Sequence, residues 1–197
     1  SQTIVYIPHF MSWVVAASIF SMIMSPTSAG LVNDVMMKLH LITDNIYFLG
    51  DQKWWRLSYY IINVWKDTGW GTIIFMATLA GISPELYEAA SMDGANRFQK
   101  MIYITLPALN NTIVTVLVLN LAKVMNLFES VFVLQNDAVI KVSDVLQTYI
   151  YTQTFNSGAI PDYGYTTAVG MFSSIISCIL VLVCNRVSHK TRGRGIV

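Results

Sequence analysis

The sequence predicts an all-α, polytopic integral membrane protein, and three observations lead to this fold class. Hydrophobic residues make up 54% of the chain and charged residues only 12%, well below the roughly 25% charged residues of soluble domains. The mean hydropathy is +0.53. Four apolar stretches approach or exceed the roughly 20 residues that a helix needs to cross a bilayer. We therefore expect a single transmembrane domain over residues 1–197 with four spans.

The first predicted span covers residues 4–24. Pro8 and His9 lie in its first turns, where a missing backbone amide costs little. A cluster of helix-breaking residues over 25–30 ends this span. The following run, 31–41, has apolar side chains at helical spacing and opposite charges four residues apart, which predicts a short amphipathic helix. Two locations for this helix remain open, the outer membrane surface or a site packed on the spans.

The second predicted span, 59–82, has a short uninterrupted apolar part. A helix over 68–82 would be about 22 Å long at ~1.5 Å per residue, and the hydrocarbon core is ~30 Å thick. The helix therefore has to begin near Tyr59, which brings Lys66 and Asp67 into the outer part of the bilayer. Charged groups there face protein or water rather than lipid. Lys66 either extends to the headgroups or lines a transport pathway.

Two residue types around this span support its placement. Aromatic side chains gather where the span begins, as they do at membrane–water interfaces: Trp54, Trp55, Tyr59 and Tyr60. Small residues recur along the span: Gly69, Gly71 and Gly81. Glycines in a membrane helix permit the close approach of a neighbouring helix.

The polar interval 83–107 predicts a compact helix–turn–helix between the second and third spans. Ser83 offers a capping hydroxyl, and the proline and acid that follow it are typical of a first helical turn. Gly94 is well placed for the left-handed residue that ends a helix. A second short helix is expected over 95–106, and Pro107 would then start the next long helix.

The third predicted span, 111–134, carries a stripe of polar residues in steps of three, which keeps them near one face of a helix: Asn120, Lys123, Asn126 and Glu129. A lysine near mid-span faces lipid only at large cost. Three explanations compete: a substrate-facing wall, a structural network with a partner subunit, or a helix that ends earlier. We take these four residues and Lys66 as the candidate substrate pathway, with Lys123 as the strongest member.

The rest of the chain sets the predicted orientation. Residues 135–165 are polar, with a helix expected over 142–155, and the fourth span covers 166–184. The tail 185–197 carries four Lys/Arg residues, and such charges mark the cytoplasmic side: Arg186, Lys190, Arg192 and Arg194. Counting back through four spans puts the interval 83–107 inside, and segments 25–58 and 135–165 outside.

Several classes of function lack their usual sequence signs. A net charge of +1 gives no nucleic-acid footprint. The chain has no Gly-x-x-x-x-Gly-Lys-[Ser/Thr] phosphate-binding loop, no His-Glu-x-x-His motif and no channel-filter sequence. Cys178 and Cys184 lie six residues apart in one apolar run, so they do not share a helix face, and neither a local disulfide nor a metal site is expected. We expect no cofactor on this chain.

One motif resembles a known family. Glu88-Ala89-Ala90, three further residues, Gly94, nine residues and Ile104-x-Leu106-Pro107 resemble the cytoplasmic coupling loop of permease subunits in binding-protein-dependent ABC importers. The runs 65–87 and 144–190 resemble the carbohydrate branch, particularly permeases for complex oligosaccharides. The resemblance covers nearly the whole chain. It implies a type I importer transmembrane fold, in which four visible spans of a usual six represent the last two-thirds of a permease.

The resemblance also implies partners. The helix around Glu88 would dock into a groove on a separate ATPase, with Ala89 and Ala90 keeping the helix thin and Gly94 making the turn. Ile104, Leu106 and Pro107 belong to the same motif, and the Leu-Pro pair would fix how the loop joins the third span. The expected partners are two ATPase subunits that bind ATP, a second and non-identical permease, an extracytoplasmic solute-binding protein, a sugar and membrane lipid. The expected location is the bacterial plasma (inner) membrane with a cytoplasmic C-terminus. The alternatives are a membrane-embedded enzyme or an ABC importer permease with a non-sugar substrate.

Overall fold

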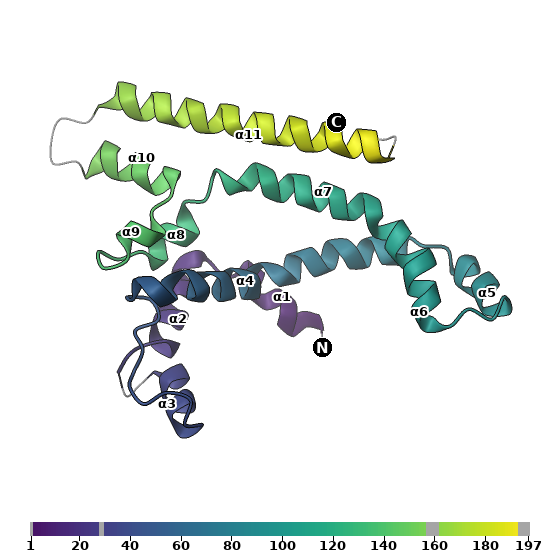
Figure 1. Cartoon of the computed structure of the whole chain (residues 1–197), viewed down its shortest axis with the longest axis horizontal. Helices are drawn as coiled ribbons and strands as arrows, with labels where there is room; N and C mark the ends of the chain where they lie inside the picture. The colour runs from purple at the N-terminus through teal and green to yellow at the C-terminus, as the bar shows by residue number, and fades with distance from the viewer. Residues whose placement is uncertain (1, 28–29, 157–161, 193–197) are drawn as a thin grey trace. The chain divides into compact units, whose positions relative to one another are not determined.

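The computed structural model describes residues 2–27, 30–156 and 162–192, and the regular structure of these ranges is helical, with no strand. The all-α prediction is confirmed. The chain, whose helices are labelled in Figure 1, divides into two compact units. The first comprises Ser1–Gly69 and Met125–Ile176, and the second comprises Trp70–Val124 and Ser177–Val197. Two long helices, α4 (Gln52–Ala80) and α11 (Tyr163–Arg192), contribute to both units.

The first unit is built from short helices around the beginning of α4. These are α1 (Gln2–Phe10), α2 (Trp13–Ile23), α3 (Leu31–Lys38), α8 (Glu129–Leu134), α9 (Ile140–Ser143) and α10 (Leu146–Phe155). Its core contains Trp55, Tyr59 and Ile62 of α4, packed with apolar side chains from α2, α8 and the intervening loops. The indole of Trp55 also donates a 3.1 Å hydrogen bond to the Leu134 carbonyl, which ties α4 to α8.

The first predicted span, 4–24, is not one continuous helix. α1 and α2 meet at a bend of 115°. Pro8 lies inside α1, where it supplies no amide to the helix, and Ser12 starts α2 by accepting a 3.2 Å hydrogen bond from the Val15 amide. A proline followed by a capping serine therefore explains the break. The length of the apolar run alone predicted one continuous helix.

The predicted amphipathic helix is present as α3, and its Lys38 ammonium lies 2.7 Å from the Asp34 carboxylate. Asn33 on the same helix is fully buried. The Asn33 amide donates to the Ser25 and Ile46 carbonyls and accepts from the Ile46 amide, each at 2.9 Å. This one side chain therefore anchors the two loops that flank α3.

The second unit contains a helical hairpin between the end of α4 and a long membrane helix. It comprises α5 (Pro84–Met92), α6 (Arg97–Lys100), the π-helical segment η1 (Met101–Thr105) and α7 (Leu106–Val124). The expected break before Pro107 is absent, because α6, η1 and α7 form one run. The Leu106 amide donates to the Met101 carbonyl, five residues back, and this wider turn accommodates a proline that cannot donate.

The predicted third helix, 111–134, is also wrong at its far end. α7 stops at Val124, and a separate helix, α8, begins at Glu129 in the first unit. The helix expected over 142–155 is interrupted between α9 and α10, and the last helix runs beyond the predicted 184 to Arg192. The turn residues 157–161 and Arg194 lie outside the described residues.

Within the described ranges, two helices are long and apolar enough to cross a membrane, Arg97–Val124 and Tyr163–Arg186. The bent pair α1–α2 adds a third if it acts as one span. α4 has the necessary length but carries Lys66 and Asp67 in its middle. The crossing assigned to 59–82 therefore stays a prediction.

Candidate functional site

The turn after α5 has the geometry expected of the coupling loop. Gly94 adopts φ +79°, the left-handed conformation that glycine accepts without steric cost. The Gly94 amide donates to the Ser91 carbonyl at 3.1 Å, and the Ala95 amide donates to the Ala90 carbonyl at 2.9 Å. This pair of hydrogen bonds is the Schellman arrangement that ends a helix. The sequence prediction for Gly94 is confirmed in its backbone conformation.

The beginnings of the two hairpin helices differ from expectation. Ser83 precedes α5 and Pro84 occupies its first turn, but the Ser83 side chain makes no capping hydrogen bond. At α6, Asn96 accepts from the Gln99 amide at 2.9 Å while the Gln99 side chain accepts from the Asn96 amide at 2.8 Å. This reciprocal capping box was missed, although the spacing of Asn96 and Gln99 in the sequence indicates it.

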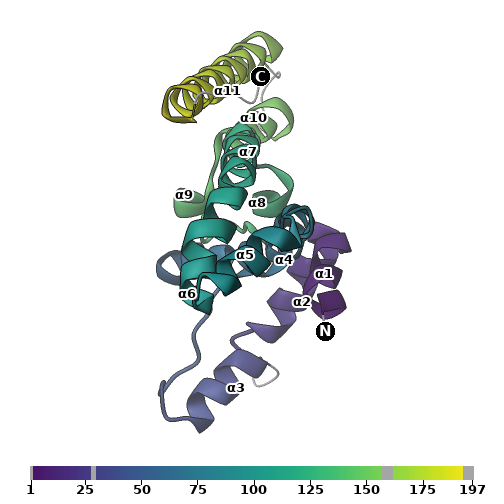
Figure 2. The same ribbon diagram turned by 90° about the vertical axis from the view of Figure 1, so that its right-hand side faces the viewer.

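Four side chains hold the two arms of the hairpin together, and the arms lie side by side in both views (Figures 1 and 2). Lys100 donates to the Ser91 hydroxyl at 2.7 Å, and Ser91 in turn donates to the Tyr87 carbonyl at 2.6 Å. The hydroxyls of Tyr87 and Thr105 are 2.9 Å apart. The hairpin is therefore a preformed unit rather than a loose loop.

The outer surface of the hairpin carries groups that its own fold does not use. The Glu88 carboxylate is exposed and makes no hydrogen bond or ion pair with another described residue. Met92 is 89% exposed and Phe98 is 68% exposed. Ala89 is exposed and Ala90 half-buried. We take this surface of the hairpin, with its exposed acid and exposed apolar side chains, as the candidate surface for contact with another protein.

The remaining motif residues lie where the hairpin joins the membrane helix. Ile104 is half-buried in η1, whereas Leu106 and Pro107 are exposed in the first turn of α7. Within the same unit the Thr78 and Thr112 hydroxyls are 2.8 Å apart, which links α4 to α7 next to this junction. A helix–helix contact therefore lies on α7 five residues after the end of the motif.

The four residues of the polar stripe are not brought together on one helix. Asn120 and Lys123 lie on α7, Asn126 lies in the turn after it, and Glu129 starts α8. This result favours the third sequence-based explanation, in which the helix ends earlier than 134. Asn120 lines an open cavity of about 410 Å³ between α4 and α7, with otherwise apolar walls.

Lys123 and the two stripe residues after α7 have local surroundings of their own. Lys123 is exposed and forms no hydrogen bond or ion pair with another described residue. Asn126 accepts a 3.3 Å hydrogen bond from the Gln147 amide. Glu129 is exposed in the first turn of α8, where a negative charge is favourable. A role of any of these side chains in a substrate pathway stays a prediction.

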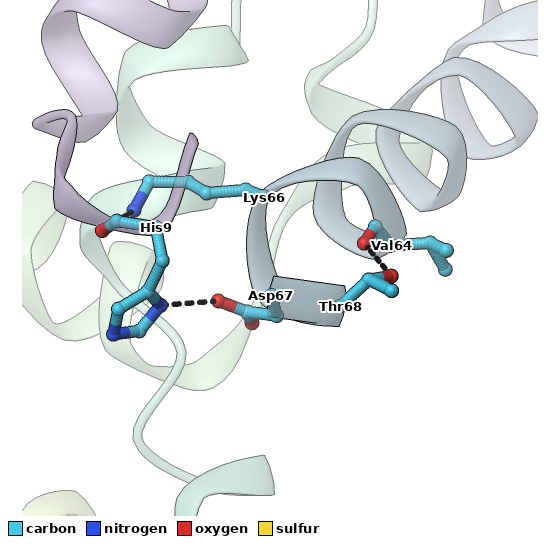
Figure 3. A network of polar contacts seen from close by, with 5 residues as sticks. All are labelled: His9, Val64, Lys66, Asp67 and Thr68. Atoms are coloured by element: carbon cyan, nitrogen blue, oxygen red, sulfur yellow. Dashed lines mark hydrogen bonds and ion pairs between the residues drawn. The ribbon is translucent and has the colours of Figure 1, made fainter. Parts of the chain in front are cut away.

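Lys66 has a contact that neither sequence-based alternative included. Its side chain is buried, its ammonium donates a 3.2 Å hydrogen bond to the His9 carbonyl, and it lies 5.1 Å from the centre of the Trp13 ring. Figure 3 shows Lys66 reaching the end of α1, while His9 Nδ1 lies 3.7 Å from Asp67 Oδ1. The neighbouring Thr68 hydroxyl donates to the Val64 carbonyl within α4. Lys66 therefore caps the helix that ends at the bend.

Together, the apolar helices that are long enough to cross a membrane and the hairpin with its exposed acid are typical of a helical membrane protein. The chain belongs to the family of binding-protein-dependent transport system inner membrane components, whose sequence profile matches residues 1–193. The predicted family is confirmed. Members of this family are inner membrane components of binding-protein-dependent transport systems.

Two curated proteins of Bacillus subtilis (strain 168) are similar to nearly the whole chain. Protein LplB is 40% identical over 99% of this chain and 60% of its own length. The polygalacturonan/rhamnogalacturonan transport system permease protein YteP is 39% identical over 99% of this chain and 59% of its own length. The chain thus spans about three-fifths of the length of the curated relatives it matches.

A solved structure shares the fold. A chain of the bacterial alginate ABC transporter, in complex with an alginate pentasaccharide-bound periplasmic protein, is 35% identical to this chain with a TM-score of 0.91. The match covers 99% of this chain and 66% of that chain. The expected type I importer fold is confirmed by this likeness.

Proposed function

We propose that the protein is the permease subunit of an ATP-driven importer of oligosaccharides. The observation that carries this proposal is the hairpin of α5 and α6. Its Gly94 turn is preformed, and its Glu88 carboxylate is exposed and unused by the fold. The saccharide transporters among its relatives support the class of substrate.

In the proposed mechanism, α5 docks into a groove on a separate ATPase that binds and hydrolyses ATP. Glu88 supplies charge or hydrogen bonds to the groove, and the small side chains of Ala89 and Ala90 allow close contact. The hairpin is closed by Lys100 and Ser91, and α6 continues through η1 into α7 without a break. A displacement of the docked hairpin therefore moves α6, η1 and α7 together as one rigid helix. An alternating-access switch requires such a rigid element.

The proposal includes further partners. Two ATPases and two non-identical permeases form the complex, and an extracytoplasmic solute-binding protein delivers the sugar. Asn120 and Lys123 on α7 contribute to the substrate pathway, because a polar or charged side chain in a membrane helix has to meet water, protein or substrate. The C-terminus lies in the cytoplasm, as the basic residues after α11 indicate.

The test uses the permease as it occurs in the cell, purified from membranes with its genomic neighbours co-expressed. We expect an ATPase subunit and a second permease to co-purify with it. In proteoliposomes, the solute-binding protein loaded with an oligosaccharide should stimulate ATP hydrolysis and drive saccharide uptake. The saccharide panel includes neutral arabino-oligosaccharides and acidic alginate and polygalacturonan oligomers, with amino acids and short peptides as non-sugar controls. Uptake of a non-sugar alone would contradict the substrate class, and purification without an ATPase would contradict the importer assignment.

A further inference from the structure

A second cavity, of about 280 Å³, lies in the first unit at the end of α2. It opens between the last turn of α2, the loop before α4 and the end of α8. Its apolar floor is formed by side chains that are at most 8% exposed: Met24, Leu49 and Leu134. The predicted topology places this end of α2 on the outer side of the membrane, where a delivered solute first meets the permease.

The walls of this cavity carry polar groups that the fold leaves unused. Ser21, Tyr47 and Gln135 line it, and their side chains make no hydrogen bond with another described residue. Tyr47 is 51% exposed, so its ring is available to a ligand. One hydroxyl, one phenol and one primary amide therefore surround an apolar floor, and such a combination orients small ligands in protein pockets.

The walls are also held in place before any ligand arrives. The Tyr47 ring lies so close to Gly50 that a Cβ atom there would come within 2.1 Å of ring atom Cε1. The Asn136 amide donates to the Leu49 carbonyl at 2.8 Å and its oxygen accepts from the Ala138 amide at 3.1 Å. The buried Asn33 anchors Ser25 and Ile46 on the opposite side. A prebuilt site loses less conformational entropy on binding.

The chemistry of the lining selects a ligand class. Hydroxyl and amide groups beside an aromatic ring match a sugar, which presents hydroxyls around its edge and C–H groups on its faces. Among the residues that the structure describes, those that line the cavity include no Lys, Arg, His, Asp or Glu. A buried carboxylate without a counter-charge is costly, so a uronate ring would be disfavoured. The volume lies near the lower end of the roughly 300–1,000 Å³ of ligand pockets, which suits one terminal ring rather than a whole oligosaccharide.

We propose that this cavity is an entry subsite that binds one uncharged sugar ring of the incoming oligosaccharide. The proposal rests on the proposed function as a saccharide importer and assigns part of its selectivity to Ser21, Tyr47 and Gln135. Tyr47 supplies a stacking surface, and the hydroxyl of Ser21 and the amide of Gln135 supply hydrogen bonds. The competing possibility, that the cavity receives a loop of the solute-binding protein, is one outcome of the test.

The experiment measures direct sugar binding to the full permease–ATPase complex in nanodiscs, without the solute-binding protein. Calorimetric titration uses a neutral arabino-oligosaccharide and an acidic alginate oligomer of the same length. We expect Tyr47→Ala and Gln135→Ala each to weaken binding of the neutral sugar about fivefold or more, as loss of one hydrogen-bonding or stacking group predicts. Ser21→Ala, a mild change on an exposed helix face, should act in the same direction. The unmodified complex should bind the acidic oligomer at least tenfold more weakly than the neutral sugar.

The matched control is Asn45→Ala, an exposed amide in the loop before α4 that does not line the cavity. The Asn45→Ala control should bind the neutral sugar as tightly as the unmodified complex. The yield and thermal stability of every variant should also equal those of the unmodified complex. Unchanged neutral-sugar binding in all three cavity variants would overturn the subsite. So would loss of capture of the sugar-free solute-binding protein with direct sugar binding intact, which would make the cavity a protein-docking surface. Equal binding of neutral and acidic oligomers would overturn the charge argument. If the unmodified complex transports no saccharide, the proposed function itself fails, and that result is separate from these.

Discussion

The Lys66 ammonium of α4 donates a hydrogen bond of 3.2 Å to the His9 carbonyl at the end of α1. The last carbonyls of a helix have no partner within that helix, and here the chain bends by 115° directly afterwards. A buried cation thus satisfies a carbonyl that the bend would leave exposed to an apolar environment. The Trp13 ring, which begins α2, covers the same ammonium.

Replacing Lys66 with methionine should therefore destabilise the bent helix pair. The change keeps the apolar stem but removes the hydrogen bond from the ammonium to the His9 carbonyl, at a cost of about 1–3 kcal/mol. We expect a lower thermal unfolding temperature of the purified permease and faster proteolysis near residues 10–13. Lys53→Met on the same helix, an exposed position, is the control and should have little effect. A loss of transport with unchanged stability would instead favour a pathway role for Lys66.

The glycines of α4 should respond differently to the same substitution. A Cβ at Gly69 would lie 2.3 Å from the Val5 carbonyl oxygen, a backbone atom, whereas a Cβ at Gly71 would meet nothing within 4 Å. Gly69→Ala should therefore disrupt the contact of α1 with α4 and reduce membrane yield and thermal stability. Gly71→Ala should be neutral or stabilising by about 0.5–1 kcal/mol, because alanine favours a helix interior. Equal behaviour of the two variants would contradict the close approach at Gly69.

The Gly94 turn should couple ATP hydrolysis to transport. At φ +79° a side chain costs roughly 1 kcal/mol or more, so Gly94→Val should distort the end of α5. We expect the variant to reach the membrane but to lose saccharide-stimulated ATPase activity and uptake. Gly71→Ala serves again as the control, since its environment is open. Normal stimulation and uptake in Gly94→Val would remove this residue from the coupling mechanism.

Lys123→Met should separate a pathway role from a packing role. Lys123 is exposed and unpaired among the described residues, so its removal should leave stability and co-purification with the ATPase unchanged. We expect a changed uptake rate or a changed preference among saccharides, measured in proteoliposomes. A complex that no longer assembles, with unchanged selectivity in the remainder, would identify Lys123 as a contact with the partner permease.

The predicted topology can be checked with single cysteines in a permease whose Cys178 and Cys184 are first replaced by serine. A cysteine at Ser91, in the hairpin, should react with a membrane-impermeant thiol reagent only after the membrane is opened. A cysteine at Asn156, after α10, should react in intact cells. Both positions are exposed, and the permease is expressed without the ATPase subunits that α5 is proposed to contact, so access is decided by the membrane. The opposite labelling pattern would invert the orientation of the chain.

The coupling motif shows how far sequence alone can go. The positive φ of Gly94 and the family were both predictable, because a left-handed turn requires glycine and the spacing to Pro107 is a local property of the chain. The capping box of Asn96 and Gln99 was equally local and was overlooked. The whole-chain composition also determined the all-α class, since long apolar runs with few charges are satisfied in lipid by helices.

Other features depended on which segments meet in three dimensions. The sequence placed Lys66 within the outer part of the bilayer, where a charge is costly. It did not indicate that the His9 carbonyl, 57 residues earlier, would be its partner. It marked both Gly69 and Gly71 as sites of close approach, and only the fold shows that Val5 lies against one of them. It extended the polar stripe of Asn120 to Glu129 along one helix, because a period of three does not reveal where a helix ends. Local backbone conformation is determined by neighbouring residues and is therefore predictable from sequence. Helix ends, the partners of buried groups and the walls of cavities are determined by contacts between residues far apart in the chain.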